Sequence, residues 1–305
     1  MRILVTGGAG FVGSHVVEAY LADGHEVRVV DNLTTGRRSN VDQRAKLHEV
    51  DIHSRELEAV FAEFKPEVVN HHAAQASVKM STHDPIRDLE QNAGGTARIA
   101  MLCVGHGVGK LIYSSSGGTV YGEPERLPLD ESHPLAPVSP YGLSKLIGEQ
   151  YLRLYQRTHG LIFTILRYSN AFGPRQDPNG EAGVVAIFTG KMLAQEPCTI
   201  DGDGEQKKDY VFVGDIARAN VLALTAGASE TLNIGTGRGI SVNEIFEALN
   251  AETGNEIPAR SGPPRPGDVR NFWLDTARAK SVLGWQPEVD FVEGIRRTVE
   301  SFVGH

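Results

Sequence analysis

A glycine-rich segment near the start of the chain constrains its fold more than any other feature. Gly7, Gly10 and Gly13 follow a short apolar run, residues 2–6. They also open a segment with helical spacing, residues 11–23. Glycines at this spacing permit a sharp turn, a close approach of the backbone to a pyrophosphate, and packing of the helix on the strand. Because free N–H groups at the helix N-terminus would face the anion, the segment predicts a dinucleotide-binding turn.

Strand-like and helix-like segments alternate throughout the first half of the chain. This alternation predicts a parallel sheet with helices on both faces. Right-handed crossovers then give a doubly wound, Rossmann-type α/β fold. The predicted strands are residues 2–6, 26–30, 46–50, 67–71, 110–114 and 161–167, and the predicted helices are residues 11–23, 55–64, 86–106 and 141–159.

The pattern changes after residue 167, where Gly-Pro, Asp-Pro and Asn-Gly pairs follow one another closely. We expect a dinucleotide-binding domain over residues 1–169 and a smaller α+β lobe over residues 170–305. Part of that lobe, about residues 210–240, is expected to return to the first sheet through a strand at residues 231–234. The other predictions are helices at 182–194, 214–224, 242–253, 276–283 and 292–302, a capping box formed by Ser241 and Glu244, and an extended loop at the proline-rich residues 260–268.

Composition excludes several classes of protein. The chain has 38 acidic and 30 basic residues, and this net charge of −8 argues against a broad surface for nucleic acid or anionic membranes. No apolar run approaches the roughly 20 residues of a membrane span, and the N-terminus lacks the pattern of a signal peptide. Cys103 and Cys198 are too few for a disulfide framework or a zinc site. We therefore expect a cytoplasmic protein.

An acidic residue follows the second predicted strand. Asp31 lies 18 residues beyond Gly13, close to the spacing of about 20 at which a carboxylate accepts hydrogen bonds from the adenosine ribose. A carboxylate there repels a 2′-phosphate and favours NAD over NADP, although Arg37 and Arg38 could bind such a phosphate. The neighbouring residues expected to contact the cofactor are Asn32 and Gly36.

A tyrosine and a lysine begin the fourth predicted helix. Tyr141 and Lys145 are four residues apart and therefore lie on one helical face. A free tyrosine has a pKa of about 10, but an ammonium together with the positive nicotinamide favours the phenolate, which makes Tyr141 a plausible general base. Residues 114–116, three serines, end the preceding strand at the edge where such sheets bind ligands. One of these hydroxyls could hydrogen-bond the reacting oxygen.

These motifs together resemble the extended short-chain dehydrogenase/reductase family. The resemblance rests on residues 6–13, 51–52, 71–74, 92 and 114–116 and on the Tyr141–Lys145 pair, and it spans nearly the whole chain. It implies an NAD-dependent enzyme in which Tyr141 and Lys145 act at the reacting centre. The cofactor contacts that it implies are Gly7, Gly10, Phe11, Val12, Asp51, Ile52, Ala73, Ala74, Gln75, Asn92, Ser114, Tyr141, Lys145 and Tyr168.

Within that family the chain is most similar to the UDP-glucose 4-epimerases. The supporting segments are residues 116–122, 166–170, 173–176, 201–204, 208–211 and 265–268. The resemblance implies that Asn170, Lys208, Arg265 and Asp268 hold the UDP moiety, since Lys and Arg donate to a diphosphate and Asp accepts from ribose hydroxyls. We expect Phe272 to line the sugar pocket and to disfavour an N-acetyl group.

The chain departs from the pattern of its relatives at two places. Lys208 stands where relatives usually carry Arg, so a bidentate phosphate contact is lost. The serine loop has one extra residue before Tyr121, so counting back selects Gly117; we select Ser116 because it has the hydroxyl. Gly117 and Gly118 also occupy the positions of an acidic pair in sugar dehydratases, and this disfavours elimination.

The implied reaction is epimerisation at C4 of a UDP-hexose through a 4-keto intermediate. Tyr141 takes the O4 proton while C4 passes hydride to NAD, Ser116 hydrogen-bonds O4, and Lys145 tunes Tyr141. The alternatives are a 4-epimerase of UDP-glucuronate or of a UDP-N-acetylhexosamine, an NADP-dependent nucleotide-sugar reductase, and a non-catalytic dinucleotide sensor. The resemblance also implies a homodimer, with residues 86–106 and 141–159 forming a four-helix interface.

Two segments look like metal sites, and we expect neither to bind a metal. Residues 201–205 suggest a calcium loop, but the glycine is misplaced and the twelfth position is Phe212. His71 and His72 are adjacent in a predicted strand, so their side chains point to opposite faces.

Overall fold

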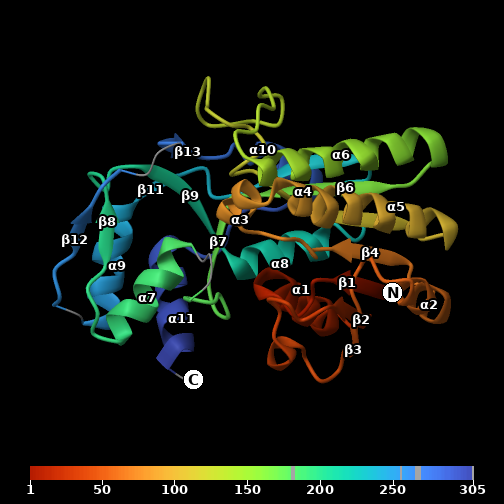
Figure 1. The fold of residues 1–305 in the computed structure, drawn as a ribbon, viewed down its shortest axis with the longest axis horizontal. Coiled ribbons are helices and arrows are strands. Elements are labelled where there is room, and N and C mark those ends of the chain that lie inside the picture. The colour runs from red at the N-terminus through yellow and green to blue at the C-terminus, as the bar shows by residue number, and fades with distance from the viewer. Residues whose placement is uncertain (180–182, 255, 265–268, 304–305) are drawn as a thin grey trace.

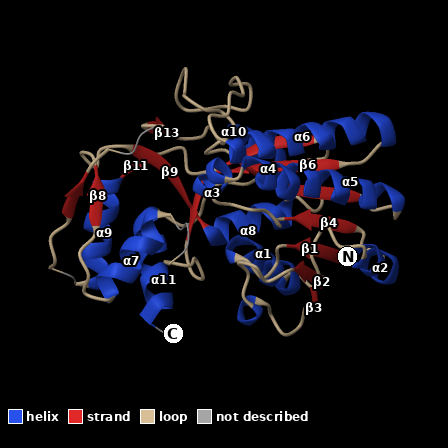
Figure 2. Cartoon of the chain, viewed as in Figure 1, coloured by secondary structure: helices blue, strands red, loops and turns tan. Residues whose placement is uncertain are grey.

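The larger part of the protein is a seven-stranded parallel sheet with helices on both faces (Figures 1 and 2). The computed structural model describes residues 1–179, 183–254, 256–264 and 269–303. The strand order is β10-β6-β5-β4-β1-β2-β3, and each neighbouring pair is parallel. The doubly wound α/β fold predicted from the sequence is therefore confirmed. The strands are β1 (Arg2–Thr6), β2 (Glu26–Asp31), β3 (Lys46–Glu49), β4 (Val68–His71), β5 (Lys110–Ser116), β6 (Phe163–Tyr168) and β10 (Glu230–Ile234).

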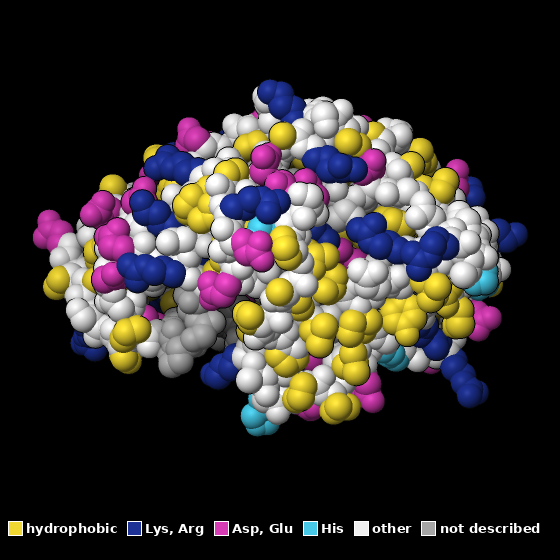
Figure 3. Space-filling view, turned by 90° about the horizontal axis from the view of Figure 1, so that it is seen from above, with side chains coloured by type: hydrophobic (Ala, Val, Ile, Leu, Met, Phe, Trp, Pro, Cys, Tyr) yellow, Lys and Arg dark blue, Asp and Glu magenta, His cyan; other side chains and the backbone are white. Residues whose placement is uncertain are grey.

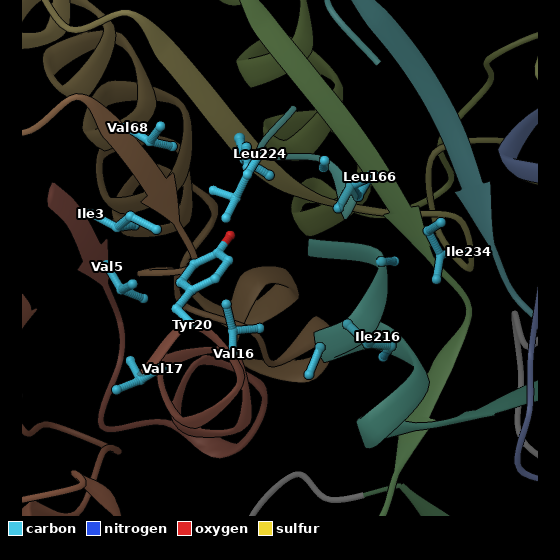
Figure 4. Packing of buried hydrophobic residues seen from close by; sticks show 14 of the residues in the cluster. Ile3, Val5, Val16, Val17, Tyr20, Val68, Leu166, Ile216, Leu224 and Ile234 are labelled. Atoms are coloured by element: carbon cyan, nitrogen blue, oxygen red, sulfur yellow. The ribbon is translucent and has the colours of Figure 1, made fainter. Parts of the chain in front are cut away.

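Alternating side chains of these strands supply two hydrophobic cores, one on each face. Ile3 and Val5 of β1 belong to one core and Leu4 to the other, as the two-residue period of a strand requires. In Figure 4, Val16 and Tyr20 of α1 point toward the sheet residues of the first core. The helices on that face are α1 (Phe11–Ala22), α8 (Val213–Leu222) and α10 (Ala277–Leu283), and those on the other face are α2 (Glu56–Phe64), α5 (Gly95–Gly105) and α6 (Pro140–His159).

The helix predicted at residues 86–106 is divided into three segments. A short helix, α4 (Pro85–Asp88), leads into a π-helix, η2 (Leu89–Gly94), which continues into α5. Another helix, α3 (Val78–His83), precedes them; the sequence did not predict it, and the Ser77 hydroxyl caps it by accepting from the Met80 N–H at 2.8 Å. π-Helical turns are rare and occur often at functional sites. A single-turn irregularity of this kind does not alter the apolar period enough to be read from sequence.

The smaller part of the protein contains short strands that come from the second half of the chain. β7 and β13 each pair with β9 in parallel, and β11 pairs with β9 in the antiparallel direction. The capping box predicted at Ser241 is confirmed, since its hydroxyl accepts from the Glu244 N–H and its own N–H donates to that carboxylate. The elements are β7 (Asn170–Phe172), α7 (Val184–Leu193), β8 (Thr199–Asp201), β9 (Lys207–Phe212), β11 (Gly239–Ser241), α9 (Val242–Thr253), β12 (Arg260–Gly262), β13 (Asn271–Phe272) and α11 (Phe291–Val303), with a 3₁₀ turn at Arg38–Asn40 in the larger part.

The prediction of a loop throughout residues 260–268 is wrong at its beginning. Arg260–Gly262 forms β12, which pairs in parallel with β8 at Thr199–Asp201. The prolines at positions 263 and 264 follow this strand, so they do not prevent its pairing.

The sheet places the predicted site residues at one edge. Because all seven strands are parallel, the carboxyl ends of β1, β2, β4, β5 and β6 meet there, and this is the edge at which open α/β sheets bind ligands. The short strands β7 and β13 lie beside the same edge (Figure 1). None of the helices in the described ranges is long and apolar enough to cross a membrane.

Candidate active site

The glycine turn after β1 is packed so closely that it excludes side chains. Gly7 has a positive φ of 72°, and a Cβ there would lie 2.5 Å from the Ala73 nitrogen. A Cβ on Gly13 would lie 2.2 Å from the Gly7 carbonyl oxygen, and one on Gly10 would lie 3.2 Å from the same oxygen. The turn therefore brings α1 against the end of β1, as the sequence predicts.

The N-terminus of α1 faces outward from this turn without a side-chain cap among the described residues. Gly10 is the N-cap, so Phe11 and Val12 occupy the first turn of the helix. Uncapped N–H groups and the partial positive charge of a helix N-terminus suit a phosphate group. At Gly7, Gly10 and Gly13 the turn has backbone without side chains next to this N-terminus. This arrangement fits the pyrophosphate of a dinucleotide.

The carboxylate predicted to hold the adenosine ribose lies at the end of β2. Asp31 accepts from the Ala9 N–H at 3.0 Å and from the Leu33 N–H at 2.9 Å. A carboxylate has about four acceptor positions, so both oxygens can still accept from ribose hydroxyls. Gly36 approaches closely enough that a Cβ would lie 2.8 Å from Asp31 Oδ1. These contacts fix the carboxylate beside the glycine turn.

Asn32, which follows Asp31 in the sequence, is hydrogen-bonded to a second carboxylate, Asp51. The Asn32 amide donates to Asp51 Oδ2 at 2.7 Å, and the His53 N–H donates to Oδ1 at 2.8 Å. Burial alone would raise the pKa of the Asp51 carboxyl, but these hydrogen bonds hold it below its usual range. Ile52 is buried beside it and contacts Gly95 so closely that a Cβ there would clash. The adenine-side residues predicted from the sequence therefore lie together.

Both arginines that could have bound a 2′-phosphate are paired with carboxylates instead. Arg37 donates to Asp177 at 2.8 Å, and Arg38 donates to Glu49 at 2.5 Å. Together with the carboxylate predicted to hold the ribose, Asp31, this arrangement favours NAD over NADP.

The loop after β4 is held in place by Asn92 from the π-helix. Its amide oxygen accepts from the Gln75 N–H at 2.8 Å, and its amide nitrogen donates to the Gln75 carbonyl at 3.0 Å. Ala73 at the start of the loop donates to the Thr6 hydroxyl at 3.3 Å, and Ala74 lies between Ala73 and Gln75. The π-helix thus fixes the predicted cofactor loop against the end of β1.

Tyr168, at the end of β6, stands at the opposite end of the predicted cofactor site. Its ring stacks on His72 with centroids 5.9 Å apart, and its hydroxyl accepts from the Asn220 amide at 2.8 Å. His71 and His72 have different partners: the His71 Nδ1 atom is hydrogen-bonded to the Thr6 hydroxyl at 2.7 Å. Among the described residues, no group of three or more His, Cys, Asp or Glu side chains could hold a metal.

The three predicted catalytic residues meet where β5 ends and α6 begins. The Ser116 side chain lies near the Tyr141 phenol, where it lowers the pKa of that phenol. Lys145 Nζ donates to the Ser114 carbonyl at 2.8 Å and lies 5.9 Å from the centroid of the Tyr141 ring. The selection of Ser116 over Gly117 stays a prediction, which the nearness of the Ser116 side chain to the phenol favours.

Burial dominates the ionisation of this group. It raises the pKa of the Tyr141 phenol, as does Asp88, while the hydrogen bond from Ser116 lowers it. Burial also lowers the pKa of Lys145 to about 8, against the opposing effect of Asp88 and Glu149. The chain alone therefore holds Tyr141 as a phenol. The predicted shift toward the phenolate depends on the nicotinamide cation in addition to Lys145.

Three of the predicted substrate residues lie together beside the serine loop. A Cβ on Gly118 would lie 3.3 Å from Phe272 Cζ and 3.6 Å from Asn170 Oδ1. Lys208 Nζ lies 5.6 Å from the centroid of the Phe272 ring and donates to the Val269 carbonyl. The other two, Arg265 and Asp268, lie outside the described residues.

Gly117 is packed too closely for a side chain unless its neighbours move. A Cβ there would lie 2.7 Å from Leu274 Cδ1 and 3.1 Å from the Arg167 carbonyl oxygen. An acidic residue at this position would displace Leu274 or the end of β6. The geometry thus agrees with the expectation that this chain does not carry the acid pair of a dehydratase.

The sequence model of the NAD dependent epimerase/dehydratase family matches residues 3–235, which hold every one of the cofactor residues described above. The chain belongs to this family. NAD is accordingly its cofactor, and the resemblance found in the sequence motifs is confirmed.

Individual members of the family match over the full length of the chain. The UDP-glucose 4-epimerase of Mycolicibacterium smegmatis is 45% identical over 308 residues, covering 99% of this chain and 98% of its own. The structure of the Thermotoga maritima UDP-glucose 4-epimerase with UDP-glucose has a TM-score of 0.98 and 48% identity, covering 100% of this chain and 99% of its own. The Thermus thermophilus UDP-glucose 4-epimerase with NAD has a TM-score of 0.95 and 46% identity at the same coverage.

Two buried carboxylates near the catalytic residues were missed in the sequence. Asp88 accepts from the Gln75 and Asn92 amides at 2.8 and 2.9 Å. Glu149 lies one helical turn beyond Lys145 and is fully buried. The signal for Glu149 was present, because Tyr141, Lys145 and Glu149 recur every four residues and therefore share a helical face. Asp88 gave no such signal, since its partners come from a loop and from the π-helix.

Replacing Gly13 by alanine tests the cofactor turn. Because the new Cβ would lie 2.2 Å from the Gly7 carbonyl oxygen, we expect α1 to shift and the purified variant to carry much less NAD than the wild type. Gly105→Ala is the matched control, since Gly105 lies in α5 with no atom within 4 Å of an added Cβ. NAD released by acid and measured per chain gives the result. A Gly13→Ala protein with full NAD content would contradict the assignment.

Proposed function

We propose that this protein is a UDP-hexose 4-epimerase that interconverts UDP-glucose and UDP-galactose with bound NAD. One observation carries the proposal: Tyr141, Lys145 and Ser116 gather where β5 ends and α6 begins, with Lys145 Nζ 5.9 Å from the centroid of the Tyr141 ring and held by the Ser114 carbonyl at 2.8 Å. The full-length relatives at 45–48% identity, all named UDP-glucose 4-epimerases, support this activity.

The chain supplies the proton chemistry. Tyr141 is the general base that takes the O4 proton, and Ser116 hydrogen-bonds O4 and orients it toward the phenol. Lys145 is anchored by the Ser114 carbonyl and holds its positive charge near the phenol, which favours the phenolate. When bound, NAD accepts the hydride from C4 and returns it to the 4-keto sugar.

The cofactor is held along the edge of the sheet. Its pyrophosphate lies at the glycine turn and the N-terminus of α1, and its adenosine lies beside Asp31 and Asp51. Its nicotinamide end lies between Lys145 and Tyr168. The residues proposed to contact NAD are Gly7, Gly10, Phe11, Val12, Asp31, Asn32, Gly36, Asp51, Ile52, Ala73, Ala74, Gln75, Asn92, Ser114, Tyr141, Lys145 and Tyr168.

The UDP-sugar is held between the serine loop and the smaller part of the protein. We assign Asn170, Lys208, Arg265 and Asp268 to the UDP moiety and Phe272 to the sugar. The Phe272 ring lies over Gly118, 3.3 Å from where a Cβ on that glycine would be, and we propose that the ring limits the room for an N-acetyl group. UDP-N-acetylhexosamines are therefore expected to react more slowly than UDP-hexoses.

The alternative functions have weaker support. A reductase using NADP would place its 2′-phosphate against Asp31, whose negative charge repels it. A non-catalytic sensor has no need of a buried Tyr–Lys pair joined to a serine. For a UDP-glucuronate epimerase, the sequence offers no feature that favours it over a UDP-hexose epimerase.

We propose a homodimer formed through α4, α5 and α6. Large apolar side chains on these helices and on η2 between α4 and α5 are exposed: Ile86, Leu89, Met101, Leu143, Tyr151 and Leu154. Figure 3 shows hydrophobic side chains gathered along this side of the molecule. A second copy placing the same helices against them would form the four-helix interface.

Sedimentation tests the proposed dimer and should give twice the mass of one chain. Leu154→Glu places a charge in the interface and should give a monomer. Val292→Glu is the control, because Val292 is exposed on α11, and it should remain a dimer.

We further propose an NAD-binding domain at residues 1–169 and a nucleotide-sugar lobe at residues 170–305, with about 210–240 returning to the first domain. The pairing of β10 with β6 and the packing of α8 on α1 support this division.

We also propose a cytoplasmic location. It is supported by Cys103 and Cys198, which are both free thiols. Recovery of the protein in an extracellular fraction would contradict that location.

Turnover of a panel of UDP-sugars tests the function. We expect the wild type to interconvert UDP-glucose and UDP-galactose, identified by NMR, and Tyr141→Phe to lose roughly 10²- to 10⁴-fold in kcat because the base is removed. Tyr155→Phe, a half-buried tyrosine on the same helix that is not among the exposed residues of the proposed interface, is the control and should retain activity. Full activity of Tyr141→Phe, or a stronger preference of the wild type for UDP-glucuronate or UDP-N-acetylglucosamine, would contradict the proposal.

A further inference from the structure

A buried ion pair lies directly behind the proposed catalytic residues. Arg167 Nε donates to Glu149 Oε1 at 2.9 Å, and Arg167 Nη2 donates to Oε2 at 2.7 Å. The two side chains are 2% and 0% exposed, so the pair is almost entirely removed from water. Glu149 is one turn beyond Lys145 in α6, and Arg167 precedes Tyr168 in β6. The proposed reaction assigns neither residue a chemical step.

The same carboxylate is tied to the strand that carries Ser116. Ser115 donates its hydroxyl to Glu149 Oε1 at 2.6 Å. Because side chains alternate along a strand, Ser115 shares its face of β5 with Tyr113, whose hydroxyl donates to the Lys145 carbonyl at 3.4 Å. The residue between Ser114 and Ser116 therefore connects β5 to α6.

The arginine is tied to the far end of the serine loop. Arg167 Nη1 donates to the Tyr121 hydroxyl at 2.9 Å, and the guanidinium lies 5.0 Å from the centroid of that ring. The Tyr121 hydroxyl in turn donates to Asn233 Oδ1 of β10 at 2.7 Å. Residues 115 and 121, which flank Ser116 and the two glycines, are therefore both attached to one ion pair.

Close packing leaves the helix no free space above the strand. A Cβ on Gly142 would lie 2.6 Å from the Thr119 carbonyl oxygen, and one on Gly148 would lie 2.4 Å from the Tyr113 hydroxyl. Contact alone sets how near α6 can approach, but it does not fix the position of the helix along the strand. Directional hydrogen bonds between charged groups do fix that position.

Removing two charges from water is costly, and a well-packed apolar pair of the same size is often as stable. The ion pair therefore needs a reason other than stability. We propose that Glu149, Arg167 and Ser115 form a positioning clamp that holds Tyr141 and Lys145 of α6 in register with Ser116 of β5. The clamp rests on the proposed function, because register matters only if the Ser116 and Tyr141 side chains act together on one sugar oxygen.

Ser115→Ala is the sharpest test of the clamp. It removes the link between β5 and α6 and leaves the Glu149–Arg167 pair intact, so no buried charge loses its partner. Small displacements of catalytic groups are costly to rate, and we expect kcat for UDP-galactose to fall by about tenfold. KM and the NAD content should stay near the wild-type values, because neither the UDP contacts nor the glycine turn changes.

Two further variants separate positioning from stability. Thr164→Val is the matched control: Thr164 lies in β6 and is fully buried, and its hydroxyl donates to the Gly227 carbonyl, away from the carboxyl edge. It should lower the melting temperature as Ser115→Ala does, with kcat unchanged. Tyr121→Phe cuts the link at the other end of the loop and should lower kcat in the same direction.

The outcomes are distinct. A fall in kcat for Ser115→Ala and Tyr121→Phe beyond that of Thr164→Val, at constant KM, supports the clamp. If kcat of Ser115→Ala and of Tyr121→Phe lies within twofold of kcat of Thr164→Val, or if only KM changes, the clamp is overturned. If Ser115→Ala does not fold, Tyr121→Phe decides by the same criterion. A wild type without epimerase activity would instead refute the proposed function, and the clamp with it.

Discussion

The contact between α1 and the turn that precedes it is the constraint on which the rest of the site depends. Gly13 meets the Gly7 carbonyl where no side chain fits, so α1 must lie across the end of β1. That placement carries Tyr20 into the core, where its hydroxyl accepts from Asn70 and donates to the Asn220 carbonyl. Asn220 in turn holds the Tyr168 hydroxyl. The pyrophosphate turn and the nicotinamide end are thus fixed by one continuous packing arrangement.

The second half of the site depends on the absence of side chains at two positions. Gly117 and Gly118 let Leu274 and Phe272 approach the serine loop, on the side where the sugar is proposed to bind. The same glycines remove the acidic groups that elimination would need. The close packing at these two glycines therefore agrees with the predicted reaction, because an added side chain at Gly117 would require Leu274 or the end of β6 to move.

Sequence reasoning located most of the fold because the signals were local. Helix α6 begins where Ser139 caps the Gly142 N–H and ends at Gly160, which has a φ of 73°. The features that were missed depend on partners far away in the chain. β12 exists because Arg260–Gly262 pairs with residues some sixty positions earlier, and the π-helix carries Asn92, whose partner Gln75 lies in the loop after β4. The raised pKa of Tyr141 likewise arises from burial, which four-residue spacing does not reveal.

The central claim is that hydride leaves C4 of the sugar and returns to the same carbon within one active site. UDP-galactose carrying deuterium at C4 tests it directly, without added NAD. The account predicts UDP-glucose with the deuterium retained at C4, because the label stays on the bound cofactor between the two transfers. Product formed in ordinary water with hydrogen in place of deuterium at C4 would contradict it.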